Sequence, residues 1–178
     1  MTQHLDVGIL IHQTPYSETS RLITWFTQEN GILRTLAKGV SRKKSSFGVL
    51  DVFYECQLSY TLKSKTSLHN LISSQLILNH GQHLSSYPKQ VSALYFFEVV
   101  EALVEKQTPI QEYYGIFRQA LLYLHTHESS WKLIERYERK ILELAGLNKP
   151  SDSLANLRKT AYHPVPKCLN LLKKVISI

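Results

Sequence analysis

The sequence predicts an α+β protein whose strands come first along the chain and whose helices follow. Residues 1–80 contain five short runs of β-branched and aromatic residues separated by turn signals, a pattern compatible with a small Greek-key barrel. After residue 80 the apolar residues recur at helical spacing instead. Because the two kinds of element are segregated, a doubly wound parallel sheet is disfavoured. We expect a boundary near residues 79–88, with domains of residues 1–80 and 81–178.

The first strand is expected over residues 7–11, followed by a turn at Gln13-Thr14-Pro15. The second strand is expected over residues 21–27. Asn30-Gly31 then predicts a hairpin, because Asn and Gly tolerate the positive φ that a tight turn demands. The remaining strands are expected over residues 32–40, 52–60 and 67–78.

Four helices are predicted from apolar stripes that repeat every three or four residues. The first begins near Pro88, and the second follows Pro109, since proline fits the first turn of a helix. The third covers residues 134–144 and is closed by Gly146, a residue suited to a C-terminal cap. A shorter fourth helix is expected over residues 166–176, after a polar connection at 148–164.

The composition favours a folded cytoplasmic protein. Hydrophobic residues make up 43% of the chain and charged residues 20%, which supplies a core and excludes a disordered tail. The apolar runs are far shorter than the ~20 residues that cross a bilayer, and the N-terminus lacks the pattern of a secretory signal. Cys56 and Cys168 have no partner at metal-ligand spacing, which fits a reducing compartment. We therefore expect no membrane partner and no disulfide framework.

The search for catalytic chemistry favours a non-enzyme. The sequence contains no Gly-rich phosphate loop and no HExxH, GxSxG or CxxC motif. Two histidine pairs have ordinary surface or core-edge explanations rather than metal-ligand geometry: His80 with His83, and His125 with His127. Three glutamates are better explained by a solvated helix face than by a metal site: Glu98, Glu101 and Glu105. We expect no catalytic residue, metal or cofactor, and a metal-dependent nuclease stays an alternative without assembled ligands.

The strongest functional signal is a basic segment over residues 34–48, in a chain whose 21 Lys and Arg outnumber its 14 Asp and Glu. The segment contains five cations and no acidic residue: Arg34, Lys38, Arg42, Lys43 and Lys44. Such cations neutralise phosphates and release counterions, while neighbouring serine hydroxyls add phosphate hydrogen bonds. The segment therefore predicts nucleic-acid binding, and a solvated basic turn without a ligand is the alternative.

Several aromatic residues near the basic segment could stack on unpaired bases: Phe47, Phe53, Tyr54 and Tyr60. Strand alternation buries about half of such positions, so core packing is the expectation for each of them.

The predicted third helix carries a second group of cations, Lys132, Arg136, Arg139 and Lys140, interleaved with Glu135, Glu138 and Glu143. An ordinary salt-bridged surface explains this pattern. The alternative is a dock for an acidic peptide, for which Arg136, Arg139 and Lys140 are the candidate partner-binding residues.

Three ordered motifs follow the first strand: a Y-x-E-x-S turn at 16–20, a T-x-F-T-x-x-x-G hairpin at 24–31, and an A-K-G-x-x-R-x-K-S element at 37–45. Together they resemble the start of the RecO family of bacterial DNA repair proteins. Beyond residue 80 the resemblance rests on helical character and on an L-E-L-A-G segment at 142–146.

The resemblance implies a five-stranded OB-fold barrel followed by an all-helical domain. It also implies that the protein binds single- and double-stranded DNA and anneals complementary strands. In the RecF pathway it would help RecA load, together with RecR and the acidic tail of the single-stranded-DNA-binding protein SSB, and it would be found at the nucleoid. The family's basic barrel surface corresponds here to Arg34, Lys38, Arg42, Lys43 and Lys44. Some members carry a Cys-rich zinc element where residues 148–153 have no cysteine, so no zinc is expected, and the chain is shorter than typical members.

An adaptor is the alternative from another class. Its OB-fold barrel would bind peptides, and its positive charge would be incidental. Salt-sensitive affinity for a bare oligonucleotide separates the two hypotheses, because an adaptor would show little of it.

Overall fold

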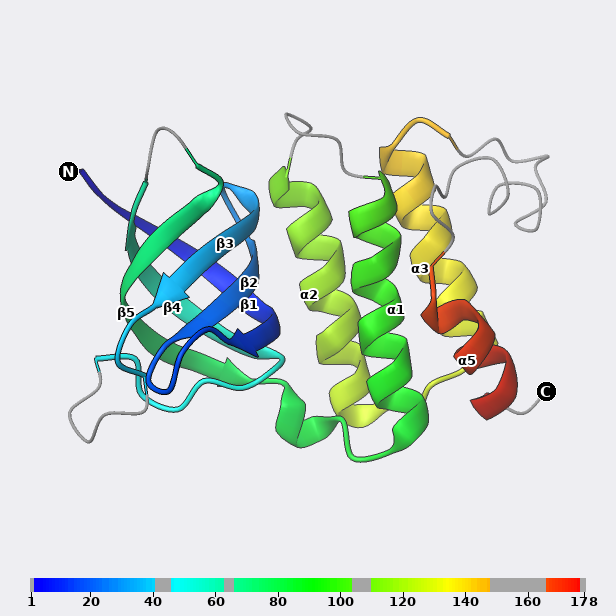
Figure 1. Ribbon diagram of the computed structural model, residues 1–178. Helices are drawn as coiled ribbons and strands as arrows, with labels where there is room; N and C mark the ends of the chain where they lie inside the picture. Colours follow the sequence, from blue (N-terminus) through cyan, green and yellow to red (C-terminus); the bar gives the residue numbers. More distant parts are fainter. Residues whose placement is uncertain (1, 41–45, 63–65, 104–109, 148–165, 177–178) are drawn as a thin grey trace. The chain divides into compact units, whose positions relative to one another are not determined.

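The computed structural model describes residues 2–40, 46–62, 66–103, 110–147 and 166–176. These residues form two compact units, Met1–Gln82 and His83–Ile178, and each is described by itself. Strands make up the first unit and helices the second (Figure 1). The predicted α+β class, with strands before helices, is therefore confirmed.

The first unit is a closed barrel of five strands: β1 (Gln3–Pro15), β2 (Arg21–Thr27), β3 (Gly31–Ala37), β4 (Tyr54–Thr61) and β5 (Leu68–Asn79). The strand order is β1-β2-β3-β5-β4, and β4 pairs back onto β1. Neighbouring strands are antiparallel except β3 and β5, which are parallel. This five-stranded Greek-key barrel is the predicted OB-fold.

The barrel interior is filled by apolar side chains from alternate positions of the strands, as the period-two pattern requires. At its centre the indole Nε1–H of Trp25 donates to the hydroxyl Oγ1 of Thr35 over 2.9 Å. Both residues have no exposed surface. The hydrogen bond therefore satisfies the polar atom that the largest core side chain brings inside.

The predicted turn at Gln13-Thr14-Pro15 is wrong, because these residues continue β1 and pair with β2 as far as Pro15 opposite Arg21. A register shift between Leu10 and His12 keeps the longer strand in pairing. Pro15 occupies the last pair of the ladder, where its missing N–H interrupts no further bonds. The chain turns over residues 16–20 instead, where the Tyr16 N–H donates to the Ser20 carbonyl over 2.9 Å.

Two other strand ends differ from their predicted positions for conformational reasons. β3 ends at Ala37 rather than residue 40, because residues 38–40 form a turn with Gly39 at φ 77°. β4 begins at Tyr54 rather than residue 52, because Phe53 adopts φ 64° and donates its N–H to the Leu10 carbonyl over 2.7 Å. The Asn-Gly hairpin is confirmed, with Gly31 at φ 64°.

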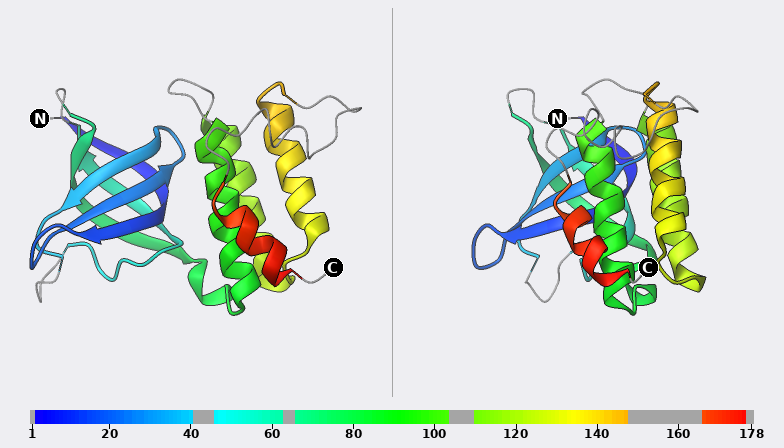
Figure 2. Two further views of the ribbon diagram at one scale, coloured as in Figure 1. Left: turned by 45° about the vertical axis from the view of Figure 1, so that its right-hand side comes forward. Right: turned by 90° about the vertical axis from the view of Figure 1, so that its right-hand side faces the viewer.

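The second unit contains α1 (Tyr87–Leu103), α2 (Ile110–Thr126), α3 (Trp131–Leu144) and α5 (Cys168–Val175), and the short 3₁₀ helix η1 (Gly81–His83) precedes α1. The first three helices lie side by side, and α5 packs against α1 (Figure 2). All four predicted helices are present, although Pro109 and the connection at 148–164 lie outside the described residues. Gly146 follows the C-terminal cap of α3 at φ 70°, as predicted.

Tyrosine hydroxyls attach α3 to α1. Tyr137 donates to the Phe96 carbonyl over 2.7 Å, and Tyr95 donates to the carboxylate of Glu138 over 2.5 Å. Glu138 has no exposed surface, so its expected place on a solvated, salt-bridged face is wrong. The reason is its position four residues after the buried Ile134, on the same side of the helix.

In the described part of the chain, no helix is both long enough and apolar enough to span a membrane.

The Trp25–Thr35 hydrogen bond predicts a specific destabilisation. Thr35→Val keeps the shape of the side chain but leaves the buried indole N–H unpaired, which should lower the free energy of unfolding by about 1–3 kcal/mol. Chemical denaturation followed by circular dichroism measures the change. In a Trp25→Phe background the same substitution should cost clearly less, because no indole N–H remains to be paired. Equal costs in the two backgrounds would contradict the assignment.

The two cysteines are predicted to be inert in the folded protein. Burial, with smaller effects of Glu55 and Glu98, raises the pKa values of Cys56 and Cys168 to about 12. At pH 8 an aromatic disulfide reagent should therefore titrate neither thiol in native protein and both after denaturation. Unfolded thiols ionise near pH 8.5 while the folded ones stay protonated, so stability should fall as the pH rises from about 8.5 toward 12. Rapid labelling of either native thiol would contradict this expectation.

Candidate nucleic-acid and partner interfaces

Two of the five predicted DNA-binding cations lie within the described residues. Arg34 stands in β3, opposite Thr24 of β2 and Leu68 of β5, and its side chain is exposed. Lys38 is the first residue beyond β3 and is also exposed. Among the described residues, neither has a carboxylate within ion-pair distance. The remaining three, Arg42, Lys43 and Lys44, lie outside the described residues.

Strand register places two turns at one end of the barrel. Pro15 pairs with Arg21, and Arg21 pairs with Ala37, so the turn at 16–20 and the turn at 38–40 begin at the same level (Figure 1). We call this end, with Arg21, Lys38 and the turn at 16–20, the basic rim. Both of its cations can face a phosphate chain that passes over the end of the barrel.

Side-chain contacts attach the far end of the basic segment to the barrel. Gln13 of β1 accepts from the Arg21 guanidinium over 3.1 Å and donates to the Leu50 carbonyl over 3.2 Å, so residue 50 is held at the basic rim. On β5, the Ser74 hydroxyl donates to the Phe47 carbonyl over 2.8 Å. The segment that follows the cations is therefore anchored at two points.

The candidate stacking aromatics are mostly core residues. Phe47 and Phe53 are each 6% exposed and Tyr60 is fully buried, which confirms the expectation of core packing for these three, while Tyr54 is half-buried. Asn30 donates to the Tyr60 hydroxyl over 3.0 Å, and burial is the main cause of a raised Tyr60 pKa. None of the three buried rings can reach a base without opening the barrel.

Sequence reasoning missed an aromatic residue at the basic rim. Tyr16 is 61% exposed and is the first residue of the turn between β1 and β2. The signal that could have found it is the Y-x-E-x-S motif, since a hydrogen-bonded turn between two strands leaves a large side chain little to pack against.

The second unit contains a groove of about 230 Å³ between α2 and α3. Its apolar lining includes Ile116, Ala120, Leu133 and Tyr137. Its basic side comes from α3, where Lys132, Arg136 and Lys140 follow one another at intervals of four residues. We call it the α2–α3 groove. Of the three candidate partner-binding residues, the structure brings Arg136 and Lys140 into this groove, whereas Arg139 is exposed and does not line it.

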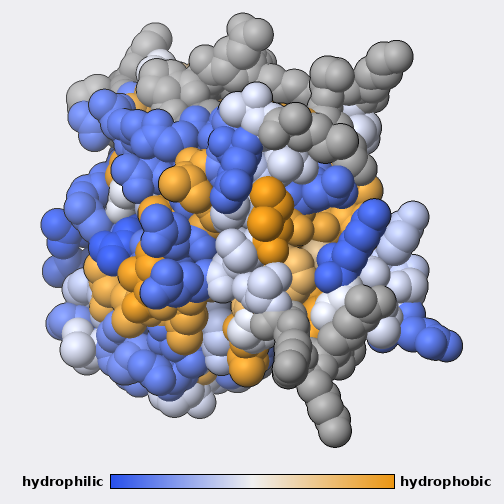
Figure 3. All heavy atoms as spheres, turned by 90° about the vertical axis from the view of Figure 1, so that its left-hand side faces the viewer, coloured by the Kyte–Doolittle hydropathy of each residue, from blue (hydrophilic) through white to orange (hydrophobic). Residues whose placement is uncertain are grey.

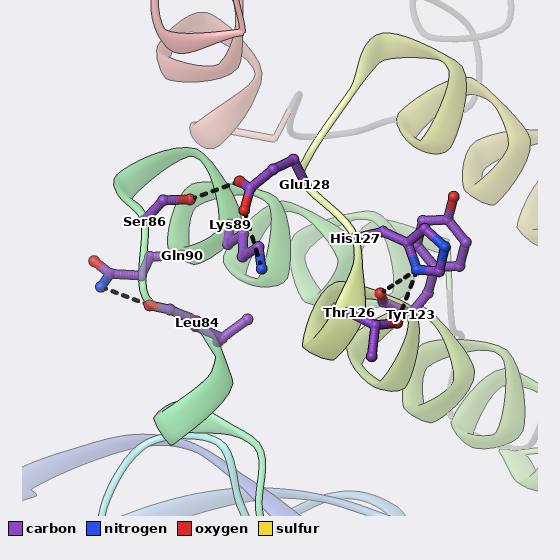
Figure 4. A network of polar contacts seen from close by, with 8 residues as sticks. All are labelled: Leu84, Ser86, Lys89, Gln90, Tyr123, Thr126, His127 and Glu128. Carbon is purple, nitrogen blue, oxygen red and sulfur yellow. Dashed lines mark hydrogen bonds and ion pairs between the residues drawn. The ribbon is translucent and has the colours of Figure 1, made fainter.

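Polar contacts hold the ends of the groove helices (Figure 4). Tyr123 lines the groove and stacks on the His127 ring at a centroid distance of 4.0 Å. In the connection between α2 and α3, Glu128 accepts from the Ser86 hydroxyl and pairs with Lys89, each over 3.2 Å. The connection between α2 and α3 is therefore held to the start of α1.

The remaining histidines and glutamates take part in local contacts. Within the described residues no three metal-ligating side chains converge. His80 pairs with the buried carboxylate of Glu55 over 3.3 Å, and the rings of His83 and His125 stack at 4.0 Å. Glu98 accepts the backbone N–H of Cys168 over 2.8 Å, so this carboxylate sits at the N-terminus of α5. Glu105 lies outside the described residues.

Comparison with known proteins gives a consistent result over both units. Residues 1–80 match the family model described as recombination protein O, N terminal. The chain is 30% identical over 147 residues to the DNA repair protein RecO of Haemophilus influenzae, and this alignment covers 82% of this chain and 61% of that protein. It is 30% identical over 143 residues to the protein of the same name from Salinibacter ruber, covering 78% of this chain and 55% of the relative.

A third relative, DNA repair protein RecO of Shouchella clausii, is 26% identical over 158 residues, which cover 89% of this chain and 61% of that protein. The chain thus spans less than two thirds of the length of these curated relatives. The matches extend well beyond the barrel, since residues 1–80 alone could not supply an alignment of this length. By its barrel and by the relatives that it matches, the chain belongs to the RecO family.

Proposed function

We propose that this chain is a DNA repair and recombination mediator that acts without covalent chemistry. Its barrel binds single- and double-stranded DNA, and the protein promotes strand annealing and RecA loading with RecR and SSB at the nucleoid. The observation that carries the proposal is the pair of exposed cations, Arg34 and Lys38, which lack acidic partners among the described residues and lead into three further cations. The relatives named as DNA repair proteins support the same conclusion.

The physical mechanism is charge neutralisation. Each Lys or Arg that contacts a phosphate releases condensed counterions, which supplies affinity without sequence preference. Cations that contact two strands at once reduce the repulsion between those strands, so complementary bases can meet more often. No bond of the DNA is broken, and turnover of DNA that depends on a divalent metal would contradict the proposal.

The cations of the barrel should control the salt dependence of DNA binding. Replacing both Arg34 and Lys38 with Ala should weaken binding to a single-stranded oligonucleotide for every sequence. It should also lower the slope of log affinity against log salt by up to about 1.4, because each phosphate contact on a single strand contributes about 0.7. Replacing Arg42, Lys43 and Lys44 with Ala should lower it by up to about 2. Fluorescence anisotropy at several salt concentrations measures both slopes.

Lys173 and Lys174 of α5 provide a matched control, because both are exposed and their removal changes the net charge by the same amount as the Arg34 and Lys38 double variant. Their replacement with Ala should leave the slope unchanged. Equal slopes for the wild type and both barrel variants would remove the basic segment from the proposed binding surface. Absence of wild-type binding at low salt would reject DNA contact altogether.

We also propose that the α2–α3 groove receives the acidic tail of SSB. An apolar lining beside a row of cations suits a peptide that carries carboxylates next to an apolar side chain. The groove is open along the surface of two helices, so an extended peptide end can enter without a change in the fold. Arg136 and Lys140 would face the carboxylates, and Tyr137 contributes to the lining beneath them.

Removing the cations of the groove should weaken peptide binding. The double variant with Arg136→Ala and Lys140→Ala should lose affinity for a synthetic SSB-tail peptide about tenfold or more, because two charge-assisted contacts disappear. Isothermal titration calorimetry with the folded full chain measures the loss. Arg139→Ala is the matched control on the same helix and should bind nearly as the wild type does. The outcome that would contradict the proposal is a larger loss for Arg139→Ala than for the double variant.

One observation favours the adaptor as the second candidate function. β5 exposes Ile72, Leu76 and Ile77 by 40–50%, and the side of the barrel seen in Figure 3 shows apolar areas among hydrophilic ones. Exposed apolar side chains on a barrel suit a protein partner better than a phosphate chain. Weak, salt-insensitive binding of oligonucleotides together with stable binding of RecR would favour this alternative.

A further inference from the structure

The exposed tyrosine of the basic rim has a defined presentation. Tyr16 begins the turn between β1 and β2, and this turn is closed by backbone hydrogen bonds from Tyr16 and Ser17 to the Ser20 carbonyl, over 2.9 and 3.2 Å. A ring held on a short hydrogen-bonded turn loses less conformational freedom on binding than a ring on a long loop. With 61% of its surface exposed, most of the ring is available to a ligand.

The surroundings of Tyr16 combine apolar surface with positive charge. Arg21 and Lys38 stand at the same end of the barrel through the pairing of Pro15 with Arg21 and of Arg21 with Ala37. Val49, 76% exposed, precedes Leu50, whose carbonyl is bound to Gln13 of the same strand end. Glu18, in the same turn, is exposed, and its negative charge repels a phosphate that lies directly over it. A polyanion can therefore approach on the side of Arg21 and Lys38.

The other tyrosine, tryptophan and phenylalanine rings described in the barrel are less exposed than Tyr16, and Tyr54 is half-buried. Trp25, Phe26 and Tyr60 have no exposed surface, and Phe47 and Phe53 are each 6% exposed. A nucleic-acid chain that is gripped through its phosphates at the basic rim therefore finds the Tyr16 ring as its largest exposed aromatic surface among the described residues of the barrel. Every base has an aromatic face, so such a ring can stack on a base of any sequence.

We propose that Tyr16 forms a base-stacking subsite, whose ligand is an unpaired nucleobase of a strand held by the cations of the basic rim. The inference rests on the proposed DNA binding and adds to it a preference for unpaired over paired bases. In a duplex each base is already stacked between its neighbours, so the tyrosine contributes to single strands and to strand ends. The cations supply affinity for either form.

The test compares two ligands of equal length, a thymidine oligonucleotide and a base-free sugar–phosphate oligonucleotide, on the full chain. Tyr16→Ala should weaken binding of the thymidine oligonucleotide by about 5- to 150-fold, the range for one base stacked on an aromatic ring. Its affinity for the base-free strand should equal that of the wild type. The salt slope should not change, because no ionic contact is lost. Fluorescence anisotropy provides all four affinities.

Two further variants separate stacking from other effects. Tyr16→Phe keeps the ring and should retain most of the affinity for the thymidine strand. Tyr87→Ala removes a comparably exposed tyrosine, 55% exposed at the start of α1, and should leave both affinities unchanged. Thermal unfolding of each variant checks the fold, and Tyr16→Ala should unfold as the wild type does, since its ring buries little surface.

The outcomes distinguish the subsite from DNA binding as a whole. Wild-type binding of both strands with no effect of Tyr16→Ala would overturn the subsite and leave the proposed function intact. An equal loss on the base-free strand would also overturn it, because the lost contact would then be to the backbone. Failure of the wild-type protein to bind either strand would reject both proposals.

Discussion

The parallel pairing of β3 with β5 is the constraint on which the barrel depends. The sheet is closed on itself by four residue pairs, which run from Arg34 opposite Leu68 to Ala37 opposite Leu71. Closure removes the open edges that five short strands would otherwise expose, and it encloses Trp25 with its hydrogen-bond partner. Because the pairing ends at Ala37, the chain leaves the barrel at that point, and the basic segment continues from Lys38 outside the strand.

The two units present their cations in different physical surroundings. On the barrel, cations stand on a strand and at a turn with no acidic neighbours within pairing distance among the described residues, so their fields add. In the helical unit, an amphipathic helix packs its apolar face inward through Ile134 and Tyr137, and its cations border a partly apolar groove. The first arrangement suits an extended polyanion, and the second suits a short segment with both carboxylates and apolar side chains.

Much of the fold followed from periodicity, and the errors have local causes. Five strands and four helices were predictable because each element buries one face, which imposes a repeat on the apolar residues. The turn assigned to Gln13-Thr14-Pro15 was wrong because a proline at the last pair of a ladder resembles a proline in a turn when only the sequence is known. The burial of Glu138 was missed because the partner that satisfies it, the Tyr95 hydroxyl, comes from another helix.

By itself the sequence determined the order of strands and helices, the run of cations and the family resemblance, since these depend on residue type and on neighbours along the chain. Only the tertiary structure decided which side chains can meet a ligand. It buried Phe47, Phe53 and Tyr60, exposed Tyr16, and brought Arg136 and Lys140, but not Arg139, to a groove with α2. The physical reason is that exposure and convergence depend on the pairing of strands and the packing of helices far apart in sequence, which no local pattern encodes.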